Sequence, residues 1–351
     1  MRTISIDTEK PYQVCIGSGL MRELGSLVKQ VHKPCRAAVV TDSTVGPLYG
    51  AGAERALEKA GFAPCRFTFP AGERSKRLGT FEEAVRFFAV HELTRSDLVV
   101  ALGGGVAGDL AGFAAACWQR GVPFVQVPTS MLCAFDASVG GKTAVDLEEG
   151  KNLVGAFHQP ILVVCDTDTF ATLDAVRVAD GAAESIKHGL IADAALFESM
   201  RTGKWLSDLE AAVEANVRVK RSFVVGDELD RGMRQLLNFG HTIGHAVEAL
   251  SGYALSHGQA VAIGMVAEMR AARRMGFGAV HESIAQEACL AAGLPVACSF
   301  SAEQVYQAAL GDKKRAGDRM TVGALKKTGE GFLQKLDMEA FRRFCALGVE
   351  A

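Results

Sequence analysis

The chain has 351 residues, of which 49% are hydrophobic and 22% charged, the balance of a globular protein with about two domains. Its formal net charge of −2 excludes a global attraction to nucleic acid or to an anionic membrane. No uncharged apolar run reaches the roughly 18 residues of a membrane span, and the start, MRTISIDTEKPYQV, lacks the apolar core of a signal peptide.

Nine cysteines are scattered through apolar segments such as ILVVC and AAACW, and no two of them form a CxxC pair. This pattern is typical of reduced cysteines in a protein core. We therefore expect a cytoplasmic protein with no disulfide framework.

The first half of the chain alternates strand and helix patterns. Short apolar runs separated by helical patterns are what a parallel sheet covered on both faces needs. The expected strands are 36–41, 66–70, 97–102, 123–127 and 161–165, and the expected helices between the first three are 52–62 and 80–93. We predict an α/β domain over residues 1–170.

From about residue 170 the segments become long, Ala-rich and helical. The helical patterns cover 170–200, 208–225, 232–250 and 257–276, and a strand is expected only near 320. This predicts a second, mostly α-helical domain over residues 171–351.

A glycine turn, GGGVAGD at 103–109, follows the expected strand 97–102 and precedes a helical pattern. Glycines let a backbone approach a pyrophosphate, and a helix N-terminus offers N–H groups to it. The alternative is a tight turn that needs glycine for its conformation. No acidic residue ends a strand about 20 residues later, as a dinucleotide site would require, so Asp42 is the alternative ribose partner.

A second glycine loop, DASVGGKT at 136–143, lacks the first glycine of a P-loop because Asp136 stands there. It presents Lys142, and Lys151 and Asn152 follow. Such a loop can hold phosphate or carboxylate through N–H and ammonium groups. The alternative is an exposed lysine loop.

Three histidines lie close together in the sequence. His241 and His245 are one helical turn apart, Gly252 is expected to end their helix, and Ser256 to cap the next one, which begins near His257. With Glu184, two of these histidines could form a zinc-type site with an open position. The alternatives are buried histidines with ordinary partners and a solvated glutamate.

Cationic side chains accompany these residues. Helical periodicity would place Arg234, Asn238, His241 and His245 along one stripe. Other basic residues lie within the predicted helices, namely Lys187, His188 and Lys220, and two more lie in the run Asp312-Lys313-Lys314. A metal beside several cations indicates a pocket for a polyanionic small molecule.

Nine blocks in this order are similar to the 3-dehydroquinate synthases of the sugar phosphate cyclase superfamily. They are PAGERSK (70–76), GGGVAGDLAGF (103–113), RGVPFVQVPTS (120–130), DASVGGKT (136–143), GKNLVGAFHQP (150–160), ESIKHGLIAD (184–193), LLNFGHTIGHA (236–246), HGQAVAIGM (257–265) and GDKK (311–314). The resemblance runs from about residue 40 to residue 330. It implies a dehydroquinate synthase-like fold, with a Rossmann-like α/β N-terminal domain and a mostly α-helical C-terminal domain.

The resemblance also implies a reaction and two cofactors. The implied reaction converts 3-deoxy-D-arabino-heptulosonate 7-phosphate to 3-dehydroquinate and phosphate, a carbon–oxygen lyase step of the shikimate route. It proceeds by transient oxidation with NAD, phosphate elimination, reduction and aldol closure, with one divalent ion, zinc or cobalt. Arg120 matches a residue lent to a neighbouring subunit, which implies a homodimer.

The resemblance assigns roles residue by residue. The implied metal ligands are Glu184, His241 and His257, with His245 beside them. The implied NAD set is Asp42, Ala71, Gly72, Glu73, Arg74, Ser75, Lys76, Gly105, Val106, Ala107, Gly108, Asp109, Thr129, Ser130, Lys142, Lys151, Thr169, Phe170, Ala171 and Thr172. The implied substrate set is Asp136, Lys142, Asn152, Lys187, Lys220, Arg234, Asn238 and one of Lys313 or Lys314.

Two positions depart from the pattern: Asp146 stands where many members have Asn, and Gln259 where they have Glu. Gln259 would remove a possible charge partner of His257. The alternatives to this function are a sibling cyclase that makes an inosose or a valiolone, a metal-dependent polyol dehydrogenase, and a non-catalytic nucleotide-sensing module. Arg234 and Asn238 favour a carboxylate-bearing substrate over a neutral sugar.

Overall fold

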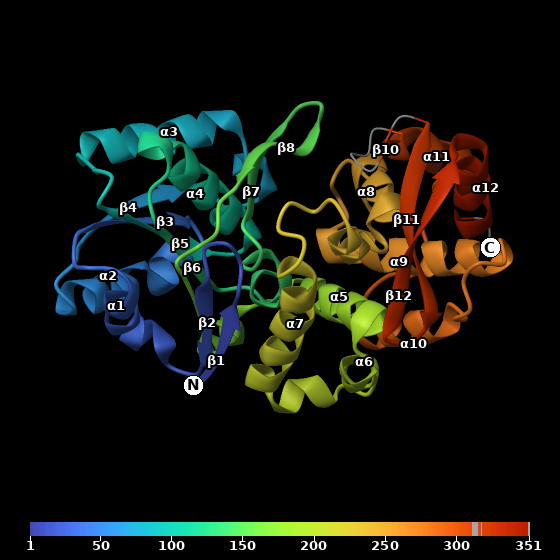
Figure 1. Cartoon of the computed structure of the whole chain (residues 1–351), viewed down its shortest axis with the longest axis horizontal. Coiled ribbons are helices and arrows are strands. Elements are labelled where there is room, and N and C mark those ends of the chain that lie inside the picture. The colour runs from blue at the N-terminus through green and yellow to red at the C-terminus, as the bar shows by residue number, and fades with distance from the viewer. Residues whose placement is uncertain (311–314, 317, 350–351) are drawn as a thin grey trace. The chain divides into compact units, whose positions relative to one another are not determined.

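The computed structural model describes residues 1–310, 315–316 and 318–349 (Figure 1). The chain forms two compact units, Met1–Leu173 and Asp174–Ala351. The candidate substrate residues Lys313 and Lys314 lie outside the described residues. In the part of the chain that is described, no helix has the length and apolar character to cross a membrane.

The first unit is built on a seven-stranded sheet in the order β1-β2-β9-β6-β5-β3-β4. All neighbouring strands from β2 across the sheet to β4 pair in parallel. The edge strand β1 pairs with β2 antiparallel. The strands are β1 (Arg2–Ile6), β2 (Tyr12–Gly17), β3 (Arg36–Asp42), β4 (Ala63–Phe69), β5 (Leu98–Gly103), β6 (Phe124–Pro128) and β9 (Leu162–Asp166). The five expected strands are all present, but β1 and β2 precede them and were not predicted.

Helices cover both faces of this sheet (Figure 1). They are α1 (Leu20–Val31), α2 (Ala51–Lys59), α3 (Leu78–Val90) and α4 (Gly105–Cys117), with the short turns η1 (Gly46–Gly50), η2 (Glu73–Ser75), η3 (Trp118–Arg120), η4 (Cys133–Ala137) and η5 (Thr167–Thr172). Neighbouring strand residues enter opposite cores: Val39 packs with α1 and α2, and Val40 with α3 and α4. Continuous apolar strands are buried on both faces for this reason.

A two-stranded antiparallel hairpin, β7 (Lys142–Leu147) and β8 (Gly150–Phe157), belongs to the same unit. The sequence predicted a glycine loop over residues 136–143. The structure instead has the turn η4, a bend at Gly140 and Gly141 with φ of 97° and 68°, and then β7. The candidate residues Lys142, Lys151 and Asn152 therefore lie on the hairpin.

The second unit is mostly helical, as predicted. Its helices are α5 (Ala175–Ala192), α6 (Ala194–Arg201), α7 (Leu209–Val224), α8 (His241–Leu250), α9 (His257–Arg274), α10 (Ser283–Ala291), α11 (Ala302–Ala309) and α12 (Met338–Val349), with η6 (Lys204–Ser207) and η7 (Met233–Asn238). The strand expected near 320 belongs to an antiparallel sheet of β10 (Arg315–Ala316), β11 (Arg319–Lys327) and β12 (Glu330–Asp337). Apolar residues of α8, α9, α11, α12 and β11 share one core. The expected fold class is confirmed.

Helices α8 and α9 approach each other closely through glycines. A Cβ added to Gly264 would lie 1.8 Å from the carbonyl oxygen of Gly240, and one added to Gly244 would lie 3.0 Å from that of Ala260. Gly240 itself has φ of 78°, a conformation that favours glycine. The predicted boundaries hold here: α8 ends before Gly252, and Ser256 caps α9 in a capping box with Gln259.

Candidate active site

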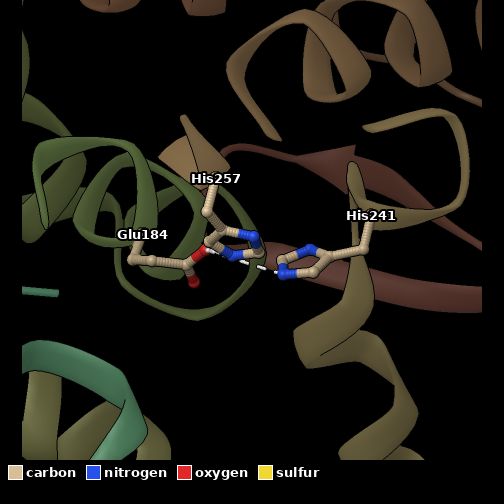
Figure 2. Close-up of side chains that lie close together, drawn as sticks. All are labelled: Glu184, His241 and His257. Atoms are coloured by element: carbon tan, nitrogen blue, oxygen red, sulfur yellow. Dashed lines mark hydrogen bonds and ion pairs between the residues drawn. The ribbon is translucent and has the colours of Figure 1, made fainter. Parts of the chain in front are cut away.

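Three helices of the second unit bring Glu184, His241 and His257 together (Figure 2). Glu184 Oε1 lies 3.2 Å from His257 Nε2 and 3.6 Å from His241 Nε2. One potential ligand atom from each side chain lies within 4.8 Å of the other two. One carboxylate oxygen and two imidazole nitrogens form a donor set that fits zinc or a similar divalent ion.

Burial differs within this group. The side chain of Glu184 is 1% exposed and that of His241 9%, whereas that of His257 is 31% exposed. Burying a carboxylate this deeply requires paired partners, and Lys187, three residues on, donates to Glu184 Oε2. An ammonium group and two imidazoles supply the partners of Glu184.

The two imidazoles have different electrostatic surroundings. Burial, together with the nearby Lys187 ammonium, holds the pKa of His241 well below its usual value. Burial would also lower the pKa of His257, but hydrogen bonds to Glu184 and Glu248 outweigh it and raise the pKa to about 10. Since metals bind neutral imidazole, loading the site would release this proton.

Glu248 was not predicted from the sequence. Its Oε2 lies 3.9 Å from His257 Nδ1, so His257 faces one carboxylate with each ring nitrogen. Glu248 also forms a second cluster with His245 and His257. Its position in α8, one turn after His245 and two after His241, was the available signal. Gln259, where the pattern has Glu, accepts from the N–H of Ser256.

The expected stripe from Arg234 through Asn238 to His245 is wrong. Arg234 and Asn238 lie on the separate turn η7. Gly240, in a left-handed conformation, separates this turn from α8, so the two segments do not form one continuous helix. The cause is the close approach of α9, which leaves no room for a side chain at Gly240. Both histidines still share α8.

The three candidate substrate cations that the structure describes in this unit are buried. Arg234 is 1% exposed, and its Nη1 donates to the carbonyl of Glu228 over 2.5 Å. Lys187 and Lys220 are 1% and 6% exposed. Burying a guanidinium and two ammonium groups is costly unless anions accompany them. Lys187 has Glu184 as its anionic partner, so the helical unit places a buried cation beside the candidate metal ligands.

In the first unit, the glycine turn lies at the carboxyl ends of the parallel strands. Helix α4 begins at Gly105, inside the turn of residues 103–109 that was expected to precede it. Asp42 Oδ1 accepts from Thr44 and Val45 over 2.8 and 2.9 Å, and a Cβ on Gly103 would lie 3.6 Å from Asp42 Oδ2. This edge of a doubly wound sheet is where such folds bind ligands.

Other candidates of this unit follow neighbouring strands at the same edge. Thr129 donates to the carbonyl of Gly103 over 2.9 Å, and a Cβ on Gly104 would lie 3.2 Å from Ser130 Oγ. The segment Thr169–Thr172 belongs to η5, directly after β9. The structure thus brings Asp42, Thr129 and Ser130 beside the glycine turn.

The expected segment Ala71–Lys76 contacts both α4 and the hairpin. Lys76 Nζ lies 2.5 Å from Asp109 Oδ2 and also donates to Asn152. Burial would lower the pKa of Lys76, but the negative charges of Asp109 and Glu73 outweigh burial and raise this pKa above its usual value. Lys151 pairs with Glu73 over 3.2 Å.

Three further candidates belong to the first unit. Asp146, a departure from the pattern, accepts from the N–H of Asn152 over 2.7 Å, and burial raises its pKa. Asp136 lies in η4, and Arg120 ends η3 with φ of 69°.

Comparison with known proteins gives consistent results. A family model described as 3-dehydroquinate synthase N-terminal matches residues 66–180, and one described as 3-dehydroquinate synthase C-terminal matches residues 181–315. A 3-dehydroquinate synthase of Streptococcus mutans is 42% identical over 344 residues, covering 95% of this chain and 97% of the relative. One of Caulobacter vibrioides is 44% identical over 363 residues, covering 98% of each.

Solved structures share the fold. A 2-epi-5-epi-valiolone synthase from Streptomyces hygroscopicus with NAD+ and Zn2+ bound has a TM-score of 0.87 at 25% identity, covering 98% of each chain. A 2-deoxy-scyllo-inosose synthase complexed with carbaglucose-6-phosphate, NAD+ and Co2+ has a TM-score of 0.86 at 23% identity, covering 99% of this chain and 100% of the other. A probable glycerol dehydrogenase from Sinorhizobium meliloti has a TM-score of 0.62 at 18% identity, covering 95% of this chain and 96% of the other.

Proposed function

This chain belongs to the 3-dehydroquinate synthase family, and from that premise we propose that it converts 3-deoxy-D-arabino-heptulosonate 7-phosphate to 3-dehydroquinate and phosphate. The observation that carries the proposal is the group of Glu184, His241 and His257, with the buried Lys187 paired to Glu184 and the buried Arg234 and Lys220 in the same unit. A neutral polyol needs no such cations, whereas a phosphorylated sugar acid does.

The proposed metal is one zinc or cobalt ion held by Glu184, His241 and His257. The donor set supports this, because it supplies one carboxylate oxygen and two imidazole nitrogens with a partly exposed side at His257. Such an ion, when bound, acidifies a substrate hydroxyl and so eases its oxidation. Glu248 would orient His257, because it faces the ring nitrogen opposite to Glu184.

The proposed NAD site is the strand-end region of the first unit. Bound NAD supplies reversible oxidation of the substrate, so the overall redox change cancels. The N-terminus of α4 would bind the pyrophosphate, and Asp42 the ribose. Lys76, Asp109 and Asn152 would hold the hairpin against the start of α4. The site would be lined by the remaining expected residues, which are those of Ala71–Lys76, Thr129, Ser130 and Thr169–Thr172.

The proposed substrate contacts use charge. Arg234 can grip a carboxylate with two parallel hydrogen bonds, and Asn238 follows it on the same turn. Lys187 and Lys220 would bind phosphate or hydroxyl oxygens, and His245 would exchange protons beside the ligand histidines. From the first unit we assign Asp136, Lys142 and Asn152 to the same substrate.

We further propose a cytoplasmic homodimer in which Arg120 reaches the neighbouring subunit. The nine cysteines, which all lie among the described residues, form no disulfide with one another, and this supports a reducing compartment. Arg120 lies at an exposed turn, which suits a contact with a second copy.

The test compares substrates. The purified protein is incubated with the heptulosonate phosphate, NAD and Co2+ or Zn2+, and released phosphate and the cyclic product are measured together. Equal amounts of both support the proposal. Faster cyclisation of glucose 6-phosphate or sedoheptulose 7-phosphate would indicate an inosose or valiolone synthase instead. Stoichiometric formation of NADH from a polyol would indicate a dehydrogenase.

A further inference from the structure

Both histidines of the candidate metal site are the first residues of their helices. His241 begins α8 and His257 begins α9. The N-terminus of a helix carries a partial positive charge and several N–H groups without helical partners. A cation held by the side chains of these two residues is therefore disfavoured by both helix ends unless anions offset them.

A buried carboxylate from α9 meets the start of α8. Glu268 is fully buried, and its oxygens accept from the N–H groups of Gly240, Thr242 and Ile243 over 2.9, 3.1 and 3.2 Å. These donors stand on either side of His241. The N-cap residue of α8 is Gly240, which has no capping side chain. Glu268, from another helix, therefore accepts the hydrogen bonds of the N–H groups that a local N-cap side chain usually satisfies.

A second buried carboxylate meets the start of α9. Asp180, 4% exposed, accepts from the hydroxyl of Ser256 and, over 3.1 Å, from the N–H of Gly258. These two residues stand on either side of His257. Helix α9 already has its own capping box, so Asp180 is not needed to satisfy that helix end; it ties the end to α5.

The two contacts link the three helices that carry the candidate ligands. Asp180 lies one helical turn before Glu184 on α5 and holds α9 at His257. Glu268 on α9 holds α8 at His241. The contacts therefore fix the positions of His257 and His241 relative to Glu184 through two charge-assisted connections.

We infer that Asp180 and Glu268 are positioning residues of the metal site: each holds a ligand histidine in place and offsets the positive end of its helix. The inference rests on the metal site of the proposed function. It predicts that removing either charge weakens metal binding about 10- to 100-fold, the usual effect of changing a group behind a ligand.

The experiment titrates Co2+ into the metal-free full chain and records both affinity and the visible absorption of the bound ion. The variants are Glu268→Gln and Asp180→Asn, which keep side-chain volume and remove charge. Glu282→Gln is the matched control, because Glu282 is also a buried carboxylate of this unit, but it pairs with Arg273 and Arg270. Unfolding in denaturant gives the stability of each protein.

Weaker Co2+ binding and a changed absorption band in Glu268→Gln and Asp180→Asn, with binding unchanged in Glu282→Gln, would support the inference. If Glu268→Gln does not fold, Asp180→Asn carries the same test. Wild-type affinity and spectrum in the folded variants would overturn it, as would an equal loss in Glu282→Gln. A wild-type chain that binds no Co2+, or a His241→Ala variant that binds it normally, would overturn the proposed metal site and this inference with it.

Discussion

At the scale of single residues, the candidate metal site centres on one carboxylate, Glu184, that is shared by an ammonium group and two imidazoles. If these side chains hold the ion, His241→Ala should lose metal and activity together, since two remaining ligands bind zinc poorly. Elemental analysis of the purified variant measures this loss. His281→Ala, at an exposed histidine of the same unit, should keep both, and full metal occupancy in His241→Ala would refute the ligand assignment.

We propose that Arg234 selects a substrate that carries a carboxylate. Arg234→Met should lower kcat/KM for the heptulosonate phosphate by roughly 30- to several-thousand-fold, because losing a buried charged partner costs about 2–5 kcal/mol. Steady-state kinetics with each substrate measures this effect, and NAD and metal binding should hardly change. Arg231→Met, at an exposed arginine nearby, is the control; equal losses in both variants would contradict the assignment.

Glu282 offers a stability prediction that depends on pH. Burial would raise its pKa, but hydrogen bonds from Arg273 outweigh it and lower the pKa to about 2, with His281 also lowering it. A lowered folded pKa adds stability above the unfolded value near 4.3, and this stability is lost as pH falls toward 2. Glu282→Gln should therefore cost about 1–3 kcal/mol at pH 7.

Urea unfolding across pH checks this expectation. The difference in free energy of unfolding between wild type and Glu282→Gln should be largest above about pH 5 and should shrink below about pH 4. A difference that stays constant down to pH 3 would mean that the Glu282 charge contributes nothing, and that packing alone explains the loss.

At the scale of elements, the contact between α8 and α9 depends on glycine. Gly264→Ala would place a Cβ against the carbonyl oxygen of Gly240, and the backbone of one helix would have to move. We expect a loss of about 2–4 kcal/mol, measured by chemical denaturation. Gly226→Ala, at a position with open space, should stay within about 0.5 kcal/mol of wild type; similar losses in both would rule out a packing cause.

The same contact explains which elements could be predicted from the sequence. The boundaries at Gly252 and Ser256 follow local rules, so the pattern of residues was sufficient. The break at Gly240 follows from the approach of α9, which is a tertiary requirement, so the stripe through Asn238 was expected where none exists. The contacts of Glu268 and Asp180 escaped prediction for the same reason: acids within apolar helices give no sign of which distant N–H groups they meet.

Strand prediction had a similar limit. Buried parallel strands such as β5 are short and continuously apolar, and the five between residues 36 and 166 were predicted, whereas β2 was missed. The hairpin β7–β8 has polar and charged residues such as Glu148 and Lys151, so no strand was predicted there. Its pairing depends on contacts such as that of Asp146 with Asn152, which no local pattern reveals.

At the scale of the whole molecule, the proposed reaction uses NAD without consuming it. With NAD well below the substrate concentration, the enzyme should complete many turnovers and accumulate no NADH. Phosphate release and absorbance of NADH, followed in one reaction, measure both quantities. Product that stops at the amount of NAD added would show that NAD is a co-substrate, and the cyclase proposal would then be wrong.

The strand order of the first unit has a consequence for how the chain leaves the ribosome. The hairpin of β1 and β2 is synthesised before β9, yet β2 pairs with β9. The start of α1 is likewise held by Asp166, 147 residues after Gly19. Until β9 emerges from the ribosome, the edge of β2 that faces away from β1 has no partner strand. Such an unpaired strand edge makes a nascent chain prone to aggregation. We expect ribosome-bound chains that end before residue 160 to be cut readily by protease within β1 and β2, and chains that extend well beyond residue 173 to resist.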